Sequence, residues 1–229
     1  MRRALPCTIQ PLMMPTPLRI AHRGMPRLAT ENTLPSFALA LECGADGIEL
    51  DVHATRDDII VVHHNSALHS GTQIRETALA DLLKEMPDLP TLVAVCELVN
   101  GRAELFVEIK GSAIEQLVEA ALTTYAGHTA IHSFDHAMIA RLAGRGTKMR
   151  LGVLVEEESE DALAIMRRTG AHDVWPHHPL VSADLVAEVH AAGGRVIPWT
   201  VNATADIARM QVLQVDGICT DDVREIDTP

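Results

Sequence analysis

Aromatic residues are scarce in this chain of 229 residues, which has three phenylalanines, two tryptophans and one tyrosine. The core must therefore be built mainly from aliphatic side chains and methionine. Apolar residues make up 47% of the chain and charged residues 22%, values typical of an ordinary globular protein. This composition excludes an intrinsically disordered chain, and the length is enough for one α/β barrel.

Long apolar runs are also missing. No stretch approaches the roughly 18 residues needed to cross a bilayer, so we expect no stable membrane insertion. The chain begins Met-Arg-Arg, but prolines at positions 6, 11, 15 and 17 interrupt any apolar segment that could serve as a secretory signal. We therefore predict a loose N-terminal arm over residues 1–17 and a cytoplasmic protein.

Paired cysteines and excess positive charge are absent as well. The four cysteines are scattered, which predicts free thiols and no zinc or redox site. The net charge of −12 would repel nucleic acids and anionic membranes, so neither is an expected partner. An anionic substrate would need a local positive centre, supplied by a metal ion or by Arg and Lys.

Strand-like and helix-like segments alternate along the rest of the chain. This alternation predicts a distorted (β/α)₈ TIM barrel over residues 18–229. A doubly wound open sheet is the competing α/β fold, but the G-x-G-x-x-G turn expected after its first strand is not present. The expected strands are 18–21, 47–52, 104–109, 129–133, 150–155, 171–175, 195–201 and 216–219.

Residues 65–90 are less regular and predict a short insertion after the second strand, with one short helix near 78–86. Asn32 is the expected N-cap of the first barrel helix. The three acids of residues 156–158 are expected in the first turn of a later helix, where they would suit the helix dipole.

Polar residues follow several of these strands, at the end of a barrel where active sites lie. Glu49 and Asp51 are two apart on one strand and therefore share a face. A buried pair of acids is unfavourable without a partner, and Glu108 on the next predicted strand adds a third carboxylate. A salt bridge would explain any one acid, but three at one level favour a calcium or magnesium site.

Two histidines suit proton transfer at this end of the barrel. His22 ends the first strand and precedes Arg-Gly, and an imidazole that titrates near neutral pH can give or take a proton. The second histidine is His63 or His64. Strand parity places these two on opposite faces, and the local pattern does not decide which faces inward.

These motifs, in their order, resemble the glycerophosphodiester phosphodiesterase family. The resemblance is carried by Ala-His-Arg-Gly (21–24), Glu-Asn-Thr (31–33), Gly-Ala-Asp-Gly-Ile-Glu-Leu-Asp-Val-His (44–53) and Val-Val-His-His (61–64). It resumes at Val-Glu-Ile-Lys (107–110), Ser-Phe-Asp (133–135), Trp-Thr-Val-Asn (199–202) and Val-Asp-Gly-Ile-Cys-Thr-Asp (215–221). Together these blocks span nearly the whole chain.

The resemblance implies a barrel like that of phosphoinositide-specific phospholipase C and assigns roles to residues. His22 and His64 would be the acid and base. His64 is chosen over His63 because the family's motif at this place is Val-Val-x-His-Asp, in which His63 takes the variable position. The other implied roles are metal ligation by Glu49, Asp51 and Glu108, phosphate binding by Arg23 and Lys110, and positions near the pocket for Glu31, Asn65 and Trp199, with Glu31 a candidate further metal contact.

The implied activity is metal-dependent hydrolysis of glycerophosphodiesters to sn-glycerol 3-phosphate and an alcohol, through a cyclic phosphate and with one divalent cation, Ca²⁺ or Mg²⁺. A lysophospholipase D-like enzyme and a catalytically inactive binding barrel are the alternatives, and the oligomeric state is open. Asn65 replaces the usual Asp, which predicts a lower pKa for His64. The short insertion leaves the alcohol side of the pocket open.

Overall fold

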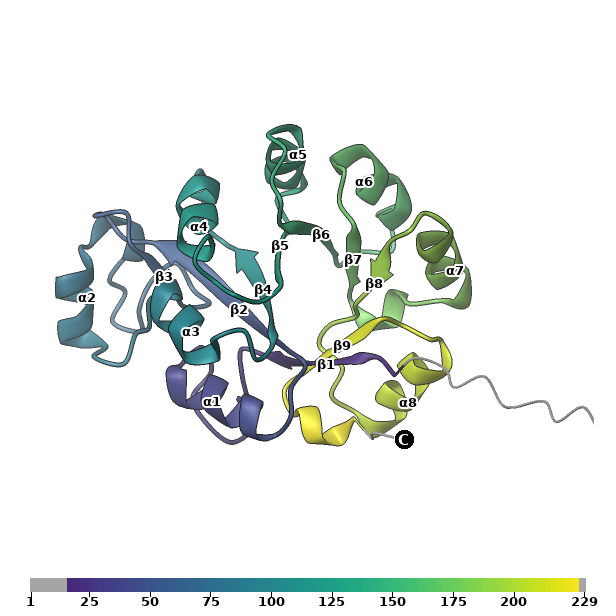
Figure 1. The fold of residues 1–229 in the computed structure, drawn as a ribbon, viewed down its shortest axis with the longest axis horizontal. Coiled ribbons are helices and arrows are strands. Elements are labelled where there is room, and N and C mark those ends of the chain that lie inside the picture. The colour runs from purple at the N-terminus through teal and green to yellow at the C-terminus, as the bar shows by residue number, and fades with distance from the viewer. Residues whose placement is uncertain (1–15, 227–229) are drawn as a thin grey trace, which may run out of the picture.

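The computed structural model describes residues 16–226, which form a parallel β-barrel surrounded by helices (Figure 1). The strand order is β8-β7-β6-β5-β4-β2-β1-β9, and all neighbouring pairs on this path are parallel. The predicted α/β barrel is therefore confirmed. Its strands are β1 (Leu18–His22), β2 (Gly47–Ala54), β4 (Glu104–Ile109), β5 (Thr129–Ser133), β6 (Arg150–Val155), β7 (Asp173–Pro176), β8 (Arg195–Val196) and β9 (Gly217–Thr220).

The helices lie outside the strands and bury an aliphatic layer against them, as the shortage of aromatics requires. Polar N-caps mark where several helices begin: Asp135 accepts a hydrogen bond from the amide of Met138, and Ser182 accepts one from that of Leu185. The helices are α1 (Leu34–Glu42), α3 (Leu92–Val99), α4 (Glu115–Leu122), α5 (His136–Gly144), α6 (Ala162–Thr169), α7 (Ala183–Ala191) and α8 (Thr204–Val212).

Two predicted helix starts are wrong. Thr33, not Asn32, caps α1, because its hydroxyl accepts from the amide of Ser36 while the Asn32 side chain turns to Asp51. The three acids of residues 156–158 precede α6 and lie outside it. The side chain of Asp161 accepts from the amide of Ala164, so the helix begins only after that aspartate.

The predicted strand over residues 195–201 is mostly irregular backbone in the structure. Strand β8 has only two residues, because Pro198 has no N–H and cannot donate to a ladder. Single backbone hydrogen bonds close the barrel instead. The amide of Cys219 donates to the carbonyl of Pro198 at 3.0 Å, and that of Asp216 donates to the carbonyl of Val196 at 2.9 Å.

Alternate strand residues point into the barrel and fill it. Phe106 and Trp175 pack edge to face inside, with ring centroids 5.2 Å apart, and five smaller side chains complete this layer. Below it, at the beginnings of the strands, Arg195 pairs with the fully buried Asp173 and with Glu104. The lower half is therefore closed, and the polar residues at the strand ends lie above it.

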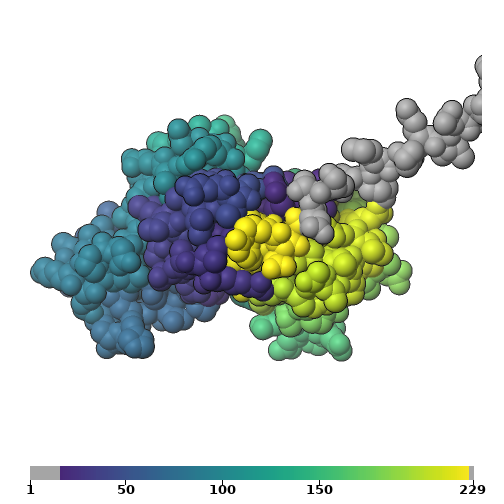
Figure 2. Space-filling view, turned by 90° about the horizontal axis from the view of Figure 1, so that it is seen from below, coloured from purple at the N-terminus to yellow at the C-terminus, as the bar shows by residue number. Residues whose placement is uncertain are grey.

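The predicted insertion after β2 is a small lobe beside the barrel. Strand β3 (Ile60–Val62) pairs antiparallel with β2, and η1 (Ile74–Glu76) and α2 (Leu79–Glu85) follow it. The lobe has its own apolar cluster and lies at one end of the molecule (Figures 1 and 2). Strand β1 pairs with β2 on one side and with β9 on the other. The two ends of the described chain therefore lie together (Figure 2).

The predicted arm over residues 1–17 lies outside the described residues except for its last two positions. Of the helices in residues 16–226, none has the length and apolar character needed to span a bilayer.

Gly47 tests the packing inside the barrel. A Cβ added there would lie 2.5 Å from Cε2 of Phe106 and 3.3 Å from Cγ1 of Ile20, and both side chains are fully buried. We expect Gly47→Ala to lower the free energy of unfolding by about 1–3 kcal/mol, measured by urea denaturation. Gly144→Ala is the control, because its added Cβ meets no atom within 4 Å. Equal stability of both variants would contradict this packing.

Candidate active site

The register of the strands places three polar side chains side by side, and a fourth lies next to them on β2. Asp51 on β2 pairs with Glu108 on β4, and Glu108 pairs with His132 on β5. Glu49 precedes Asp51 by two residues on β2, so its side chain lies on the same face. All four side chains are buried, although each is polar or charged. Such a cluster requires partners, because a buried charge without one is unfavourable.

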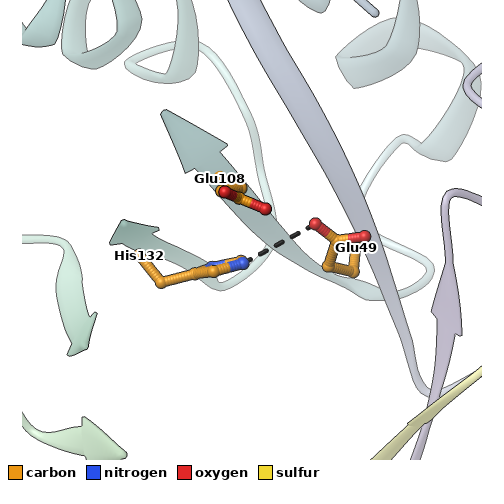
Figure 3. A group of neighbouring side chains, drawn as sticks. All are labelled: Glu49, Glu108 and His132. Carbon is orange, nitrogen blue, oxygen red and sulfur yellow. Dashed lines mark ion pairs between the residues drawn. The ribbon is translucent and has the colours of Figure 1, made fainter. Parts of the chain in front are cut away.

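Three of these side chains form a group that could hold a metal ion. Glu49, Glu108 and His132 each offer a ligand atom, and these atoms all lie within 4.8 Å of one another. The three side chains point toward one another from neighbouring strands, with Nε2 of His132 at 3.6 Å from Oε1 of Glu49 (Figure 3). The structure thus brings together two predicted ligands, Glu49 and Glu108. His132 was not predicted to be a ligand.

Asp51 lies beside this group but is held by other residues. Its Oδ2 accepts a hydrogen bond from Nδ2 of Asn32 at 2.9 Å and lies 3.0 Å from Nε of Arg23. Its Oδ1 lies 3.4 Å from Nζ of Lys110 and, although buried, accepts no hydrogen bond from a described residue. Burial would raise the pKa of Asp51, but Arg23, then Lys110 and Asn32, hold it below its usual range.

Glu108 shows how unbalanced the charge is. Its Oε1 lies 2.9 Å from Nζ of Lys110, yet burial and the nearby charge of Asp51 raise its pKa to about 7. Three carboxylates face two cationic side chains here. The donor set fits a divalent cation: carboxylates, an imidazole whose Nε2 faces Glu49, and Oδ1 of Asp51, which accepts no hydrogen bond within the described chain.

The turn after β1 carries Arg23 and Asn32 to these acids. Arg23 has a φ of 55°, and its amide donates to the backbone carbonyl of Glu49 at 3.0 Å. Gly24 follows with a φ of 91°, and any Cβ there would collide with Ser36. The carboxylate of Glu31 accepts from Nη1 of Arg23 at 3.1 Å. Glu31 is therefore an ion-pair partner of Arg23 in this structure.

His22 lies against a residue from the far end of the chain. Its Nδ1 is 2.7 Å from Oδ1 of Asp221, and the other carboxylate oxygen of Asp221 accepts from Nδ2 of Asn202 at 2.7 Å. Burial lowers the pKa of His22, but the hydrogen bond to Asp221 and the negative charges of Glu49 and Asp221 together outweigh it, so the pKa is raised. With Nδ1 engaged, Nε2 is the nitrogen free to act on a substrate.

His64 has a different partner. Its Nδ1 lies 2.9 Å from the amide oxygen of Asn65, and burial lowers its pKa even though Asp51 acts in the opposite sense. The hydrogen bond to Asn65 acts to raise this pKa, so burial, and not Asn65, is the cause of the lowering. His63 instead directs Nδ1 to the backbone carbonyl of Asn65 at 2.8 Å and does not line the cavity described next.

One cavity joins these groups. It has a volume of about 240 Å³ and includes both acid/base candidates and both phosphate-binding candidates. Trp199 lines it as well, whereas Asn65, Glu31 and Asp51 lie behind residues that do. The residues that line it include His22, Arg23, Glu49, His64, Glu108, Lys110, His132, Phe134, Glu156, Trp175 and Trp199.

His132, Asp221 and Asn32 were missed as functional candidates from the sequence. His132 ends a predicted strand at the level of Glu108, which is the one local signal it gives. Asp221 and His22 are 199 residues apart, so only the closed barrel shows their contact. Asn32 was assigned to helix capping, a role that its residue type equally suits.

Comparisons with known proteins give one consistent result. The model of the glycerophosphoryl diester phosphodiesterase family matches residues 22–225. A glycerophosphodiester phosphodiesterase from Caldanaerobacter subterraneus is 30% identical over 228 residues, covering 90% of this chain and 94% of its own. The crystal structure of a glycerophosphodiester phosphodiesterase from Thermotoga maritima has the same fold, with a TM-score of 0.81, 23% identity and coverage of 90% and 96%. A phosphodiesterase from Oleispira antarctica, in complex with the product sn-glycerol-3-phosphate, has a TM-score of 0.82 at 22% identity, with coverage of 93% and 95%.

The raised pKa of Glu108 predicts pH-dependent metal binding. Below about pH 7 this carboxyl holds a proton that a cation must displace, so affinity for Ca²⁺ or Mg²⁺ should rise up to about tenfold per pH unit toward pH 7 and level off above it. Calorimetric titration of the metal-free protein between pH 5.5 and 8.5 measures this. Glu108→Gln should weaken binding and flatten the dependence. A flat profile for the unaltered protein would contradict the assignment.

Asn32 is predicted to hold Asp51 for a metal ion. Asn32→Ala removes the hydrogen bond to Oδ2 of Asp51, and we expect a loss of metal affinity of roughly 10- to 100-fold by calorimetry. Asn100→Ala is a matched control. Asn100 has a positive φ, 47°, as Asn32 does at 56°, but it caps α3 and makes no hydrogen bond to the acids. Equal metal affinities in the two variants would show that Asn32 has no such role.

Proposed function

This chain belongs to the glycerophosphoryl diester phosphodiesterase family, whose members are phosphoric diester hydrolases, and we propose that it releases sn-glycerol 3-phosphate from glycerophosphodiesters by two-histidine acid/base catalysis. One observation carries the proposal above all. His22, which ends β1, and His64, which follows β3, line the same cavity as Arg23, Lys110 and the buried acids Glu49 and Glu108. This is the set of groups that hydrolysis of a phosphodiester needs.

Glu49 and Glu108 would hold the divalent cation, with His132 or Asp51 completing its ligands. When bound, the cation supplies charge neutralisation and lowers the pKa of a coordinated hydroxyl. The carboxylates suit Ca²⁺ or Mg²⁺, which prefer oxygen ligands, whereas an imidazole ligand would widen the choice to softer metals.

Arg23 and Lys110 would bind the non-bridging oxygens of the phosphate. Both already lie among carboxylates, with Nε of Arg23 at 3.0 Å from Asp51 and Nζ of Lys110 at 2.9 Å from Glu108. These contacts fix their positions before substrate arrives. Such preorganised cations stabilise the charge that grows on the phosphate in the transition state without further reorganisation.

The two histidines would move the protons. One takes the proton of the glycerol hydroxyl next to the phosphate as that oxygen attacks phosphorus, and the other protonates the departing alcohol as its P–O bond breaks. A cyclic glycerol phosphate results. Water then opens the ring with the same two imidazoles acting in reverse, which returns sn-glycerol 3-phosphate. Asp221 and Asn65 each bind Nδ1 of one histidine, which leaves Nε2 of both for these steps.

A lysophospholipase D-like reaction and an inactive binding barrel are less well supported. A lipid substrate would call for an apolar channel for its acyl chain, whereas the cavity, lined by charged as well as apolar side chains, has a volume of only about 240 Å³. A binding barrel would have no need for the complete set of acids and imidazoles.

Activity measurements test the proposal. We expect His22→Ala and His64→Ala each to lower kcat for glycerol 3-phosphate release from glycerophosphocholine by roughly 10²- to 10⁴-fold, with the fold retained by circular dichroism. His63→Ala is the matched control and should keep its activity, because His63 lies outside the cavity. A chelator should also abolish release. Retained turnover in either of the first two variants would refute the acid/base roles.

A further inference from the structure

Two aromatic rings stand at the mouth of the cavity, although the chain has few to place there. Phe134, just after β5, is 42% exposed and packs edge to face on Trp199, with centroids 5.6 Å apart and ring planes at 85°. Trp199 is fixed, because its Nε1 donates to the backbone carbonyl of Trp175 at 2.9 Å. The rings of Phe134 and Trp199 therefore form a corner on the rim, and the imidazole of His177 lies 5.5 Å from the ring of Trp199.

The cavity differs between its floor and its rim. His132 and Trp175 are each 1% exposed and form the floor beside the buried acids, whereas Phe134 and Glu156 are exposed on the rim. Under the proposed function, the phosphate and glycerol occupy the floor, where the acids and cations are. The alcohol, which differs between substrates and must leave toward solvent, then contacts the rim.

Charge is also distributed unequally across the cavity. The cationic side chains Arg23 and Lys110 follow β1 and β4, whereas Glu156 follows β6, which lies four strands from β1 and two from β4 in the sheet (Figure 1). The backbone amide of Glu156 donates to Oε2 of Glu160 at 3.0 Å, and its carboxylate makes no ion pair or hydrogen bond within residues 16–226. The cationic groups of the cavity are thus already paired with carboxylates, whereas the rim has an aromatic corner and a free negative group.

From this arrangement, and resting on the proposed function, we propose that the corner of Phe134 and Trp199, with Glu156, is a subsite for a cationic alcohol. The preferred substrates are zwitterionic glycerophosphodiesters, whose alcohol carries an ammonium group as choline and ethanolamine do. An ammonium over an aromatic face gains a cation–π interaction, and a nearby carboxylate adds Coulomb attraction. Uncharged alcohols such as glycerol or inositol gain neither.

A neutral isostere isolates the role of the charge. Glycerophosphocholine is compared with the ester in which a tert-butyl group replaces the trimethylammonium group, so that the two substrates have nearly the same shape. We expect kcat/KM to favour the choline ester by roughly fivefold or more. Glu156→Gln and Phe134→Leu should each move this ratio toward one. Glu157→Gln is the control and should keep the ratio, because Glu157 lies on the same loop but lines a different cavity.

Binding to His22→Ala, with metal present, separates the subsite from the reaction. We expect the choline ester to bind this variant more tightly than the isostere by a similar factor in calorimetry. Equal affinities and equal kcat/KM values would overturn the subsite, while release of glycerol 3-phosphate from both esters would leave the proposed function standing. If His22→Ala bound the choline ester more tightly but the unaltered protein released glycerol 3-phosphate from neither ester, the subsite would be supported and the proposed function refuted.

Discussion

Three buried carboxylates on two neighbouring strands of the barrel are the constraint on which the site depends. Glu49, Asp51 and Glu108 are brought together by strand register, and their mutual repulsion must be offset. Arg23 and Lys110 offset part of it, and the pKa of Glu108, about 7, shows that the balance is incomplete. The turn after β1, with two consecutive residues at positive φ, follows from the need to bring Arg23 to these acids.

Closure of the barrel matters for chemistry as well as for stability. Pairing of β1 with β9 places Asp221 against His22, so the first and last strands together build one half of the acid/base pair. The other half, His64, depends on the β2–β3 hairpin and has an amide partner in Asn65. One imidazole is thus paired with a full negative charge and the other with a neutral dipole, and the two pKa values are displaced in opposite directions.

Local pattern was sufficient for much of the fold and for part of the site. Alternating segments predicted the barrel, and the period of two along β2 predicted that Glu49 and Asp51 share a face. Contacts between residues far apart in the sequence could not be predicted from local pattern. The contact of Asp221 with His22 and the turn of Asn32 toward Asp51 exist only after closure. Pro198 could have signalled that β8 would be cut short, since proline cannot donate to a ladder.

The few aromatic residues show how the two halves of the barrel differ. Phe106 and Trp175 are fully buried along its axis, where they fill space that aliphatic side chains elsewhere fill. Phe134 and Trp199 stand above them at the mouth, and the indole of Trp199 is tied to the backbone of Trp175. The rigid floor therefore holds the rim in place. Phe134 packs on Trp199 and is still 42% exposed, so part of its ring is open to whatever occupies the mouth of the cavity.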